Sequence, residues 1–249
     1  MGKVWFMSII RVMLKKGMPA FCLLFMVAGI YFFNSKEAAT VKSYWLWKES
    51  DLRFVSAGDQ LYLYQGDYLL EGSSRDFVKR GVSPSARFKQ HSLILLVRLY
   101  RIEDVERLVF HLRYLLSEWK LKGVEIKEIQ LDYDCASAHL ADYSSFLKQL
   151  AATLNNNGQG DAVMLSVTGL VTWLTDNPAA LADVSRNVSY IHFQLYNNFF
   201  PLPNIANYLH HIGNYKHPYK LGITMAKPFQ TLEFSLNEYY QGTTIFLNR

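Results

Sequence analysis

Residues 125–134 read EIKEIQLDYD, in which polar and apolar residues alternate from Glu128 onward and the last two polar residues are carboxylates. Successive side chains of a β-strand point to opposite faces, so Gln130, Asp132 and Asp134 share one face while the residues between them share the other. In a barrel of parallel strands the first face lines the mouth at the carboxyl ends, where enzymes of this architecture place their catalytic groups. The stretch therefore predicts both a fold class and a place for chemistry.

Similar short apolar runs recur along the chain and are separated by segments with helical spacing. Candidate strands cover residues 41–47, 60–65, 92–98, 125–132, 162–168, 188–196, 220–225 and 243–247. The clearest helical patterns cover residues 105–119 and 140–154. Strands and helices that alternate through the 214 residues from 36 to 249 predict a compact α/β fold, a (β/α)8 TIM-type barrel. A doubly wound parallel sheet is the alternative.

The N-terminal region has the pattern of a membrane anchor. Residues 17–33 contain no charged side chain, and with Asn34 and Ser35 the run approaches the roughly 20 residues that cross a hydrocarbon core. Basic residues without acidic ones precede it, which favours a cytoplasmic N-terminus. A cleaved signal peptide is the alternative. We expect a cytoplasmic basic tail at 1–16, a single transmembrane helix at 17–35, a linker at 36–41 and, at 42–249, a barrel domain outside the inner (cytoplasmic) membrane, periplasmic or extracytoplasmic.

Composition and charge narrow the classes of function. Half of the chain is apolar, which is enough for a sizeable core. The formal net charge is +5, but four of these charges precede the apolar run, so a net +1 is left for residues 36–249. The excess of basic residues therefore reflects the orientation of the chain in the membrane, and we expect no nucleic-acid partner. Cys135 is alone in the exported part, which excludes an internal disulfide there.

Two carboxylates at positions i and i+2 of one strand suit acid–base chemistry. The backbones of Asp132 and Asp134 are about 7 Å apart in an extended strand, close enough for one charge to raise the other pKa. A protonated carboxyl beside an ionised one is the pairing used to cleave glycosidic bonds. The alternative is that the pair caps the following helix or binds an adventitious cation.

The run IHFQLYNNFF, residues 191–200, closes another predicted strand with polar groups. Alternation places His192, Gln194 and Tyr196 on the inward face. The Tyr196 hydroxyl is expected to bind a sugar or its acetamide at the mouth. Nearby aromatic residues could stack on sugar rings, although most aromatic residues in such a chain pack the core. These candidates are Trp47, Tyr100, Trp173 and Phe199.

Three segments, EIQLDYDC, LSVTGLVTWL and FQLYNN, resemble a family of uncharacterised bacterial proteins known only as a domain of unknown function. More distantly they are similar to the family eighteen glycoside hydrolases, the chitinase-like barrels. The strand-four signature of those enzymes is Asp-x-x-Asp-x-Asp-x-Glu, and strand six ends in Gln-x-Tyr-Asn in some members.

The resemblance implies particular roles for three residues. Asp134 falls on the acid glutamate, Asp132 on the aspartate that orients the substrate acetamide, and Tyr196 on the tyrosine that binds the same group. Lys127 and Gln130 stand where the family has its first two aspartates, and the predicted last strand lacks the tryptophan expected as a sugar platform.

Two functions remain open at this stage. One is a membrane-anchored glycoside hydrolase-like protein acting on an envelope or extracellular polysaccharide. Its catalytic residues would be Asp134 and Asp132, and its substrate-binding residues Tyr196, Gln194, Gln130 and Trp47. The other is a non-catalytic carbohydrate-binding or envelope assembly protein on a degenerate barrel. We expect no cofactor and no metal, because no phosphate loop, Cys-x-x-Cys pair or nucleophile elbow occurs and adjacent His210 and His211 point apart on a helix.

Overall fold

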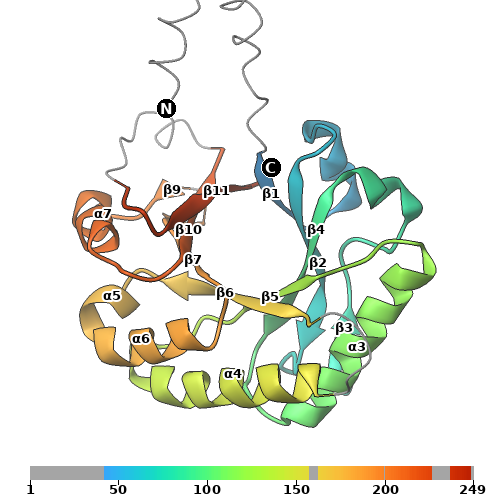
Figure 1. Ribbon diagram of the computed structural model, residues 1–249, viewed down its shortest axis with the longest axis horizontal. Helices are drawn as coiled ribbons and strands as arrows, with labels where there is room; N and C mark the ends of the chain where they lie inside the picture. The colour runs from blue at the N-terminus through green and yellow to red at the C-terminus, as the bar shows by residue number, and fades with distance from the viewer. Residues whose placement is uncertain (1–41, 157–161, 199, 226–235, 248–249) are drawn as a thin grey trace, which may run out of the picture. The chain divides into compact units, whose positions relative to one another are not determined.

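The computed structural model describes residues 42–156, 162–198, 200–225 and 236–247. Eight parallel strands in these residues close into a barrel, since β1 pairs with both β2 and β11. Figure 1 looks into this barrel. In spatial order the strands are β1 (Ser43–Leu46), β2 (Gln60–Tyr68), β4 (Ser92–Leu99), β5 (Glu128–Asp132), β6 (Met164–Leu170), β7 (Ile191–Gln194), β10 (Tyr219–Thr224) and β11 (Tyr240–Phe246). The barrel prediction is confirmed, and each expected strand range overlaps one of these strands.

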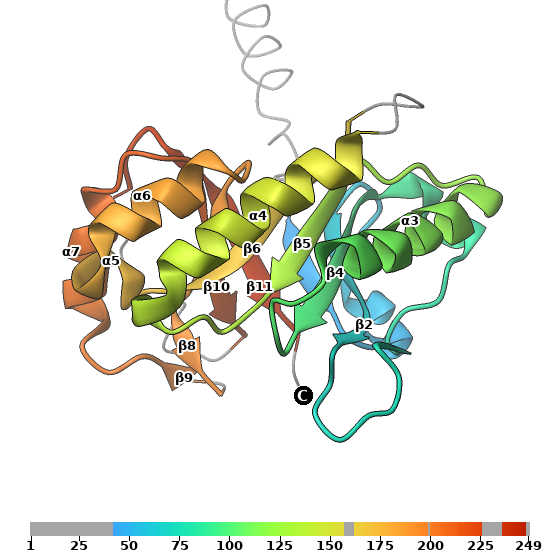
Figure 2. The same ribbon diagram turned by 90° about the horizontal axis from the view of Figure 1, so that it is seen from below.

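Helices cover the outside of the barrel from β4 to β10 (Figure 2). They are α3 (Val105–Leu121), α4 (Leu140–Asn155), α5 (Trp173–Asp176), α6 (Pro178–Arg186) and α7 (Ile205–Gly213), with the 3-10 turn η3 (Ser137–His139) before α4. The links from β1 to β2 and from β2 to β4 contain only the 3-10 helices η1 (Glu49–Phe54) and η2 (Ala86–Gln90) and the antiparallel strand β3 (Phe77–Lys79). Coverage is therefore thinner on this side, as the short first link predicts.

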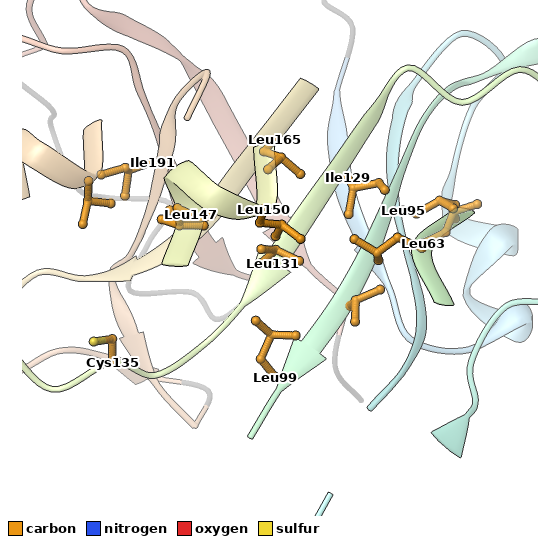
Figure 3. Packing of buried hydrophobic residues seen from close by; sticks show 14 of the residues in the cluster. Leu63, Leu95, Leu99, Ile129, Leu131, Cys135, Leu147, Leu150, Leu165 and Ile191 are labelled. Carbon is orange, nitrogen blue, oxygen red and sulfur yellow. The ribbon is translucent and has the colours of Figure 1, made fainter. Parts of the chain in front are cut away.

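The two faces of the strands form two separate cores. Outward-facing Ile129 and Leu131 of β5 pack with Leu147 and Leu150 of α4 in the larger core, part of which appears in Figure 3. The smaller core lies inside the barrel and is largely aromatic. Its members are Trp45, Tyr62, Tyr64, Ile94, Leu96 and Tyr190. Gln130, between the two outward residues, contacts this inner core, which confirms the alternation predicted for β5.

Gly222 on β10 makes room for the largest inner side chain. A Cβ atom at this position would lie 2.5 Å from the ring carbon Cη2 of Trp45. That separation is far below van der Waals contact, so a larger residue would push the indole out of the barrel interior. The Trp45 indole therefore depends on a glycine at position 222.

Charged and phenolic groups fill the interior at the amino end of the barrel. Tyr190 donates a hydrogen bond to Glu128, the first residue of β5, and its own hydroxyl lies 2.6 Å from that of Tyr62. Lys220 donates to Tyr62 Oη over 2.9 Å. Burial raises the pKa of Glu128 and lowers the pKa of Lys220. We call these four residues the amino-end network, and each ionisable group in it has internal partners.

Candidate active site at the carboxyl end of the barrel

A pocket of about 790 Å³ opens at the carboxyl end of the barrel, where residues at or just after the ends of six barrel strands meet. This is the end at which barrel enzymes carry their active sites. The lining residues are Trp47, Lys48, Asp51, Arg98, Asp134, Leu170, Gln194, Tyr196, Asn197, Asn198, Leu202, Phe246 and Leu247. The structure thus brings Trp47, Asp134, Gln194 and Tyr196 to one pocket, from chain positions that are far apart.

Asp134 lies two residues beyond the end of β5 and presents its carboxyl group to the pocket. Partial burial raises the pKa of this carboxyl, and the negative charge of Asp132 raises it further, whereas the Arg98 guanidinium opposes both effects. A carboxyl that holds its proton to higher pH is the form that a general acid requires. The like-charge coupling expected for the two aspartates therefore exists, but burial is the larger cause.

Asp132 is held by internal partners. Arg98 Nε donates to Oδ2 over 3.0 Å and Thr168 Oγ1 donates to Oδ1 over 2.7 Å, while only 6% of the residue is exposed. Asp132 does not line the large pocket. It lines an adjacent pocket of about 230 Å³, which shares Arg98 and Asp134 with the large one.

Sequence reasoning missed Arg98. The β4 and β5 strands are in register with Arg98 opposite Asp132, which explains the ion pair. The guanidinium carbon also lies 4.6 Å from the ring centre of Trp47, within cation–π range. The sequence SLILLVRL offered a signal, because Arg98 is the next-to-last residue of a strand whose other inward residues, Ile94 and Leu96, are aliphatic.

Aromatic rings form one wall of the pocket. Tyr196 and Phe246 stack with their ring centres 5.7 Å apart and their planes 8° apart, and Phe246 meets Trp47 edge-on at 5.9 Å. Trp47 in turn stacks on Tyr64 at 4.2 Å. Burial, followed by the charge of Asp132, raises the pKa of Tyr196, so its hydroxyl stays protonated and able to donate. Phe246 is the aromatic group that the last strand supplies.

Gln194 and Gln130 lie at different depths in the barrel. Gln194 lines the pocket, and its Nε2 atom lies 3.5 Å from Asp132 Oδ1. Gln130 is fully buried: its Oε1 accepts from Trp45 Nε1 over 2.8 Å, and its Nε2 donates to His192 Nδ1 over 2.9 Å. The structure therefore places Gln130 in the barrel interior, away from the residues that line the pocket.

The other aromatic candidates lie in three different settings. Tyr100 is 41% exposed and lines the smaller pocket beside Asp132. Trp173 is fully buried, and its Nε1 donates to the carbonyl oxygen of Cys135, so the expectation that it stacks on a sugar is wrong. Phe199 lies outside the described residues.

Two further findings concern only the residues that the structure describes. Among them, no three histidine, cysteine, aspartate or glutamate residues are placed to hold a metal ion. None of the helices in these same segments is long and apolar enough to cross a membrane. The predicted anchor at 17–35 and the flanking tail and linker lie outside the described residues.

Comparison with known proteins supports the resemblance drawn from the sequence. Residues 92–199 match the family described as Domain of unknown function (DUF3142), a range that includes Arg98, Asp134 and Tyr196. The solved structure of a GH18 chitinase from Pseudoalteromonas aurantia is similar, with a TM-score of 0.50 and 14% identity over 82% of this chain and 94% of that chain. No curated protein matches the chain. The predicted family resemblance is confirmed, and at this identity the chitinase shows a shared fold.

Proposed function

We propose that this chain is a membrane-anchored glycoside hydrolase that cleaves an envelope or extracellular polysaccharide at the carboxyl end of its barrel. The observation that carries the proposal is the carboxyl group of Asp134, which faces a pocket of about 790 Å³ with a raised pKa. Hydrolysis of a glycosidic bond needs a proton for the leaving oxygen, and Asp134 is positioned to supply it.

The aromatic wall fits a carbohydrate ligand. Sugar rings present flat C–H faces that pack on aromatic side chains, and their hydroxyl groups need polar partners. Trp47, Tyr196 and Phe246 offer the first kind of surface, and Gln194 and the protonated Tyr196 hydroxyl offer the second. A bound sugar would thus lie against the rings with its glycosidic oxygen toward Asp134.

A non-catalytic carbohydrate-binding or assembly protein is the second candidate. It is favoured by the arrangement of Asp132, whose two oxygens are engaged by Arg98 and Thr168. The residue that the resemblance assigns to substrate orientation then has a structural role. In this case the pocket binds sugar while the glycosidic bond stays intact.

Turnover by the parental chain separates the two candidates, and turnover by the Asp134→Asn variant tests the acid assignment. The full-length chain is incubated with β-1,4-linked oligosaccharides of N-acetylglucosamine, glucosamine and glucose, and products are measured by mass spectrometry. We expect cleavage by the parental chain and a loss of about two to four powers of ten in rate for the variant, with sugar binding retained. Asp183→Asn is the matched control, because this aspartate lies on α6 outside the pocket and its side chain is 49% exposed. Parental rates in Asp134→Asn contradict the acid assignment, and binding without cleavage supports the second candidate.

The membrane anchor is a separate proposal that rests on the uncharged run at 17–33 and the basic residues before it. It places residues 42–249 on the periplasmic or extracytoplasmic side of the inner membrane. Fractionation of cells that express a C-terminally tagged chain tests it. Recovery in the membrane fraction at full length supports the anchor, and recovery as a shortened soluble form contradicts it.

A further inference from the structure

We propose that Asp51 is the second carboxylate of the site and acts as the general base toward a water molecule. The reaction would then use two protein carboxylates, and the substrate class would include sugars that lack a 2-acetamido group. This inference rests on the proposed function, because it assigns a partner to the acid Asp134.

Asp51 and Asp134 approach the same pocket from distant parts of the barrel wall. Asp51 lies on η1, which follows β1, whereas Asp134 follows β5, and both side chains line the pocket of about 790 Å³. In the barrel order β1-β2-β4-β5 the two strands are three places apart. Neighbouring strands lie about 4.8 Å apart, so the ends of β1 and β5 are roughly 14 Å apart along the curved wall and closer in a straight line across the mouth. Asp51 and Asp134 therefore face one pocket from separate parts of its wall.

The two pocket aspartates differ from the other acidic groups around the mouth in their partners. Asp132 is engaged by Arg98 and Thr168, and Asp67 by Tyr64 and Arg80. Within the described residues, neither Asp51 nor Asp134 makes a side-chain hydrogen bond or an ion pair, and the Arg98 guanidinium acts on Asp134 without direct contact.

A pocket carboxylate without an internal partner is available to a ligand, since burial against other protein groups does not already satisfy it. The engaged aspartates, in contrast, would have to give up strong charge-assisted bonds before they could act. Asp132 is therefore poorly placed to hold a substrate acetamide, and a second catalytic group has to come from elsewhere on the pocket.

The chemistry balances with these two groups. Asp134 donates its proton to the glycosidic oxygen as the bond from that oxygen to the anomeric carbon breaks. Asp51 takes a proton from water, whose oxygen forms the new bond to the anomeric carbon. The leaving sugar departs as an alcohol, and Asp51 later returns its proton to solvent while Asp134 regains one. Inverting glycosidases hold their two carboxyl groups about 6.5–9.5 Å apart, which leaves room for this water, and we expect the same separation when substrate is bound.

Glycosides with two kinds of leaving group test the assignment. The full-length chain is assayed on the β-1,4-linked oligosaccharides named above and on 2,4-dinitrophenyl β-glycosides of the same sugars, whose leaving group needs no proton. We expect Asp51→Asn to lose about two to four powers of ten in rate on both kinds of substrate. Asp134→Asn should lose as much on the oligosaccharides but stay within about tenfold of the parent on the dinitrophenyl glycosides.

Two controls complete the design. Glu49→Gln changes a carboxylate on the same short helix that does not line the pocket, and it should keep the parental rate. Azide should partly restore turnover of the dinitrophenyl glycoside by Asp51→Ala, with a glycosyl azide of inverted configuration as the product. Circular dichroism melting checks that each variant is folded.

Separate outcomes overturn separate claims. Parental rates in Asp51→Asn overturn the role of Asp51 and leave Asp134 as the acid. Cleavage restricted to N-acetylglucosamine oligosaccharides overturns the wider substrate class. If the parental chain cleaves none of these probes, the proposed function fails and the carboxylate pair fails with it.

Discussion

At the amino end of the barrel Glu128 is enclosed by hydrogen-bond donors, whereas at the carboxyl end Asp134 faces an open pocket. Both carboxylates belong to the same inward-facing series that starts on β5, and burial raises the pKa of each. Glu128 is 7% exposed and is connected through Tyr190 and Tyr62 to Lys220. A structural carboxylate therefore begins β5, and an available one lies two residues beyond its end.

The interior of this barrel is polar at both ends, but only the carboxyl end offers a carboxyl group to a ligand. A buried charge is tolerated when its partners are also buried, and removal of one partner is costly because the other is left uncompensated. An ionisable group at the pocket is stabilised less by the protein and is free to interact with a ligand. We therefore expect mutations at the two ends to separate stability from activity.

The largest effect on stability is expected for Lys220→Met. The methionine fills a similar volume but cannot donate to Tyr62 or to Gln60, to which Lys220 Nζ donates over 2.9 Å and 2.7 Å. Loss of hydrogen bonds from a buried charged group should lower the free energy of unfolding by about 3 kcal/mol. Urea denaturation followed by tryptophan fluorescence measures it. A change below about 0.5 kcal/mol would mean that the amino-end network is dispensable.

A lower pH is expected to reduce the free energy of unfolding by an intermediate amount. Burial lowers the pKa of His192 well below its ordinary value, so the unfolded chain takes up a proton first as the pH falls through about 6.5. Stability from this group is present above that pH and is lost below it, by at most about 1.4 kcal/mol per pH unit. Burial also lowers the pKa of His111, which adds to the loss, and the raised pKa of Glu128 opposes it.

The contribution of His192 is isolated by comparison with His192→Gln. The free energy of unfolding is measured in urea at pH 7.5 and 5.5 for both proteins. The parent should lose more stability than the variant over this interval. Equal losses would show that the imidazole is not held neutral by its surroundings, which include the rings of Trp45, Tyr62 and Tyr190.

The smallest effect on stability is expected for Asp134→Asn. This side chain has no internal hydrogen bond among the described residues, and its raised pKa means that the charged form is disfavoured in the folded chain. The free energy of unfolding at pH 7 should stay within about 0.5 kcal/mol of the parent or rise slightly. A loss of several kcal/mol would make Asp134 a structural carboxylate like Glu128 and remove the contrast between the two ends.

Much of the fold could be predicted from the sequence because its strands are short apolar runs with period-two alternation. That alternation also placed Asp134, Tyr196 and Gln194 on inward faces at strand ends, and the structure brings these three to one pocket. Gln130 shares the face but lies four residues before Asp134, which is about 13 Å deeper along a strand. Alternation predicts the face to which a side chain points. Its depth along the barrel axis depends on the register of neighbouring strands, which the sequence does not give.

The rest of the site depended on contacts between distant segments. The pair of Arg98 and Asp132 follows from the register of β4 against β5, which the sequence alone does not fix. Asp51 lies on a 3-10 helix of six residues, too short for any periodic signal. Trp173 was expected at a sugar, but its indole packs in the outer core under α5, where only tertiary structure places it.

The most direct test of the account is a crystal structure of the chain soaked with a β-1,4-linked N-acetylglucosamine or glucose oligosaccharide. We expect a sugar ring against Tyr196, Phe246 and Trp47, with a glycosidic oxygen within hydrogen-bond distance of the Asp134 carboxyl group. A sugar bound elsewhere on the barrel, or one whose glycosidic oxygen lies beyond the reach of Asp134, would contradict it.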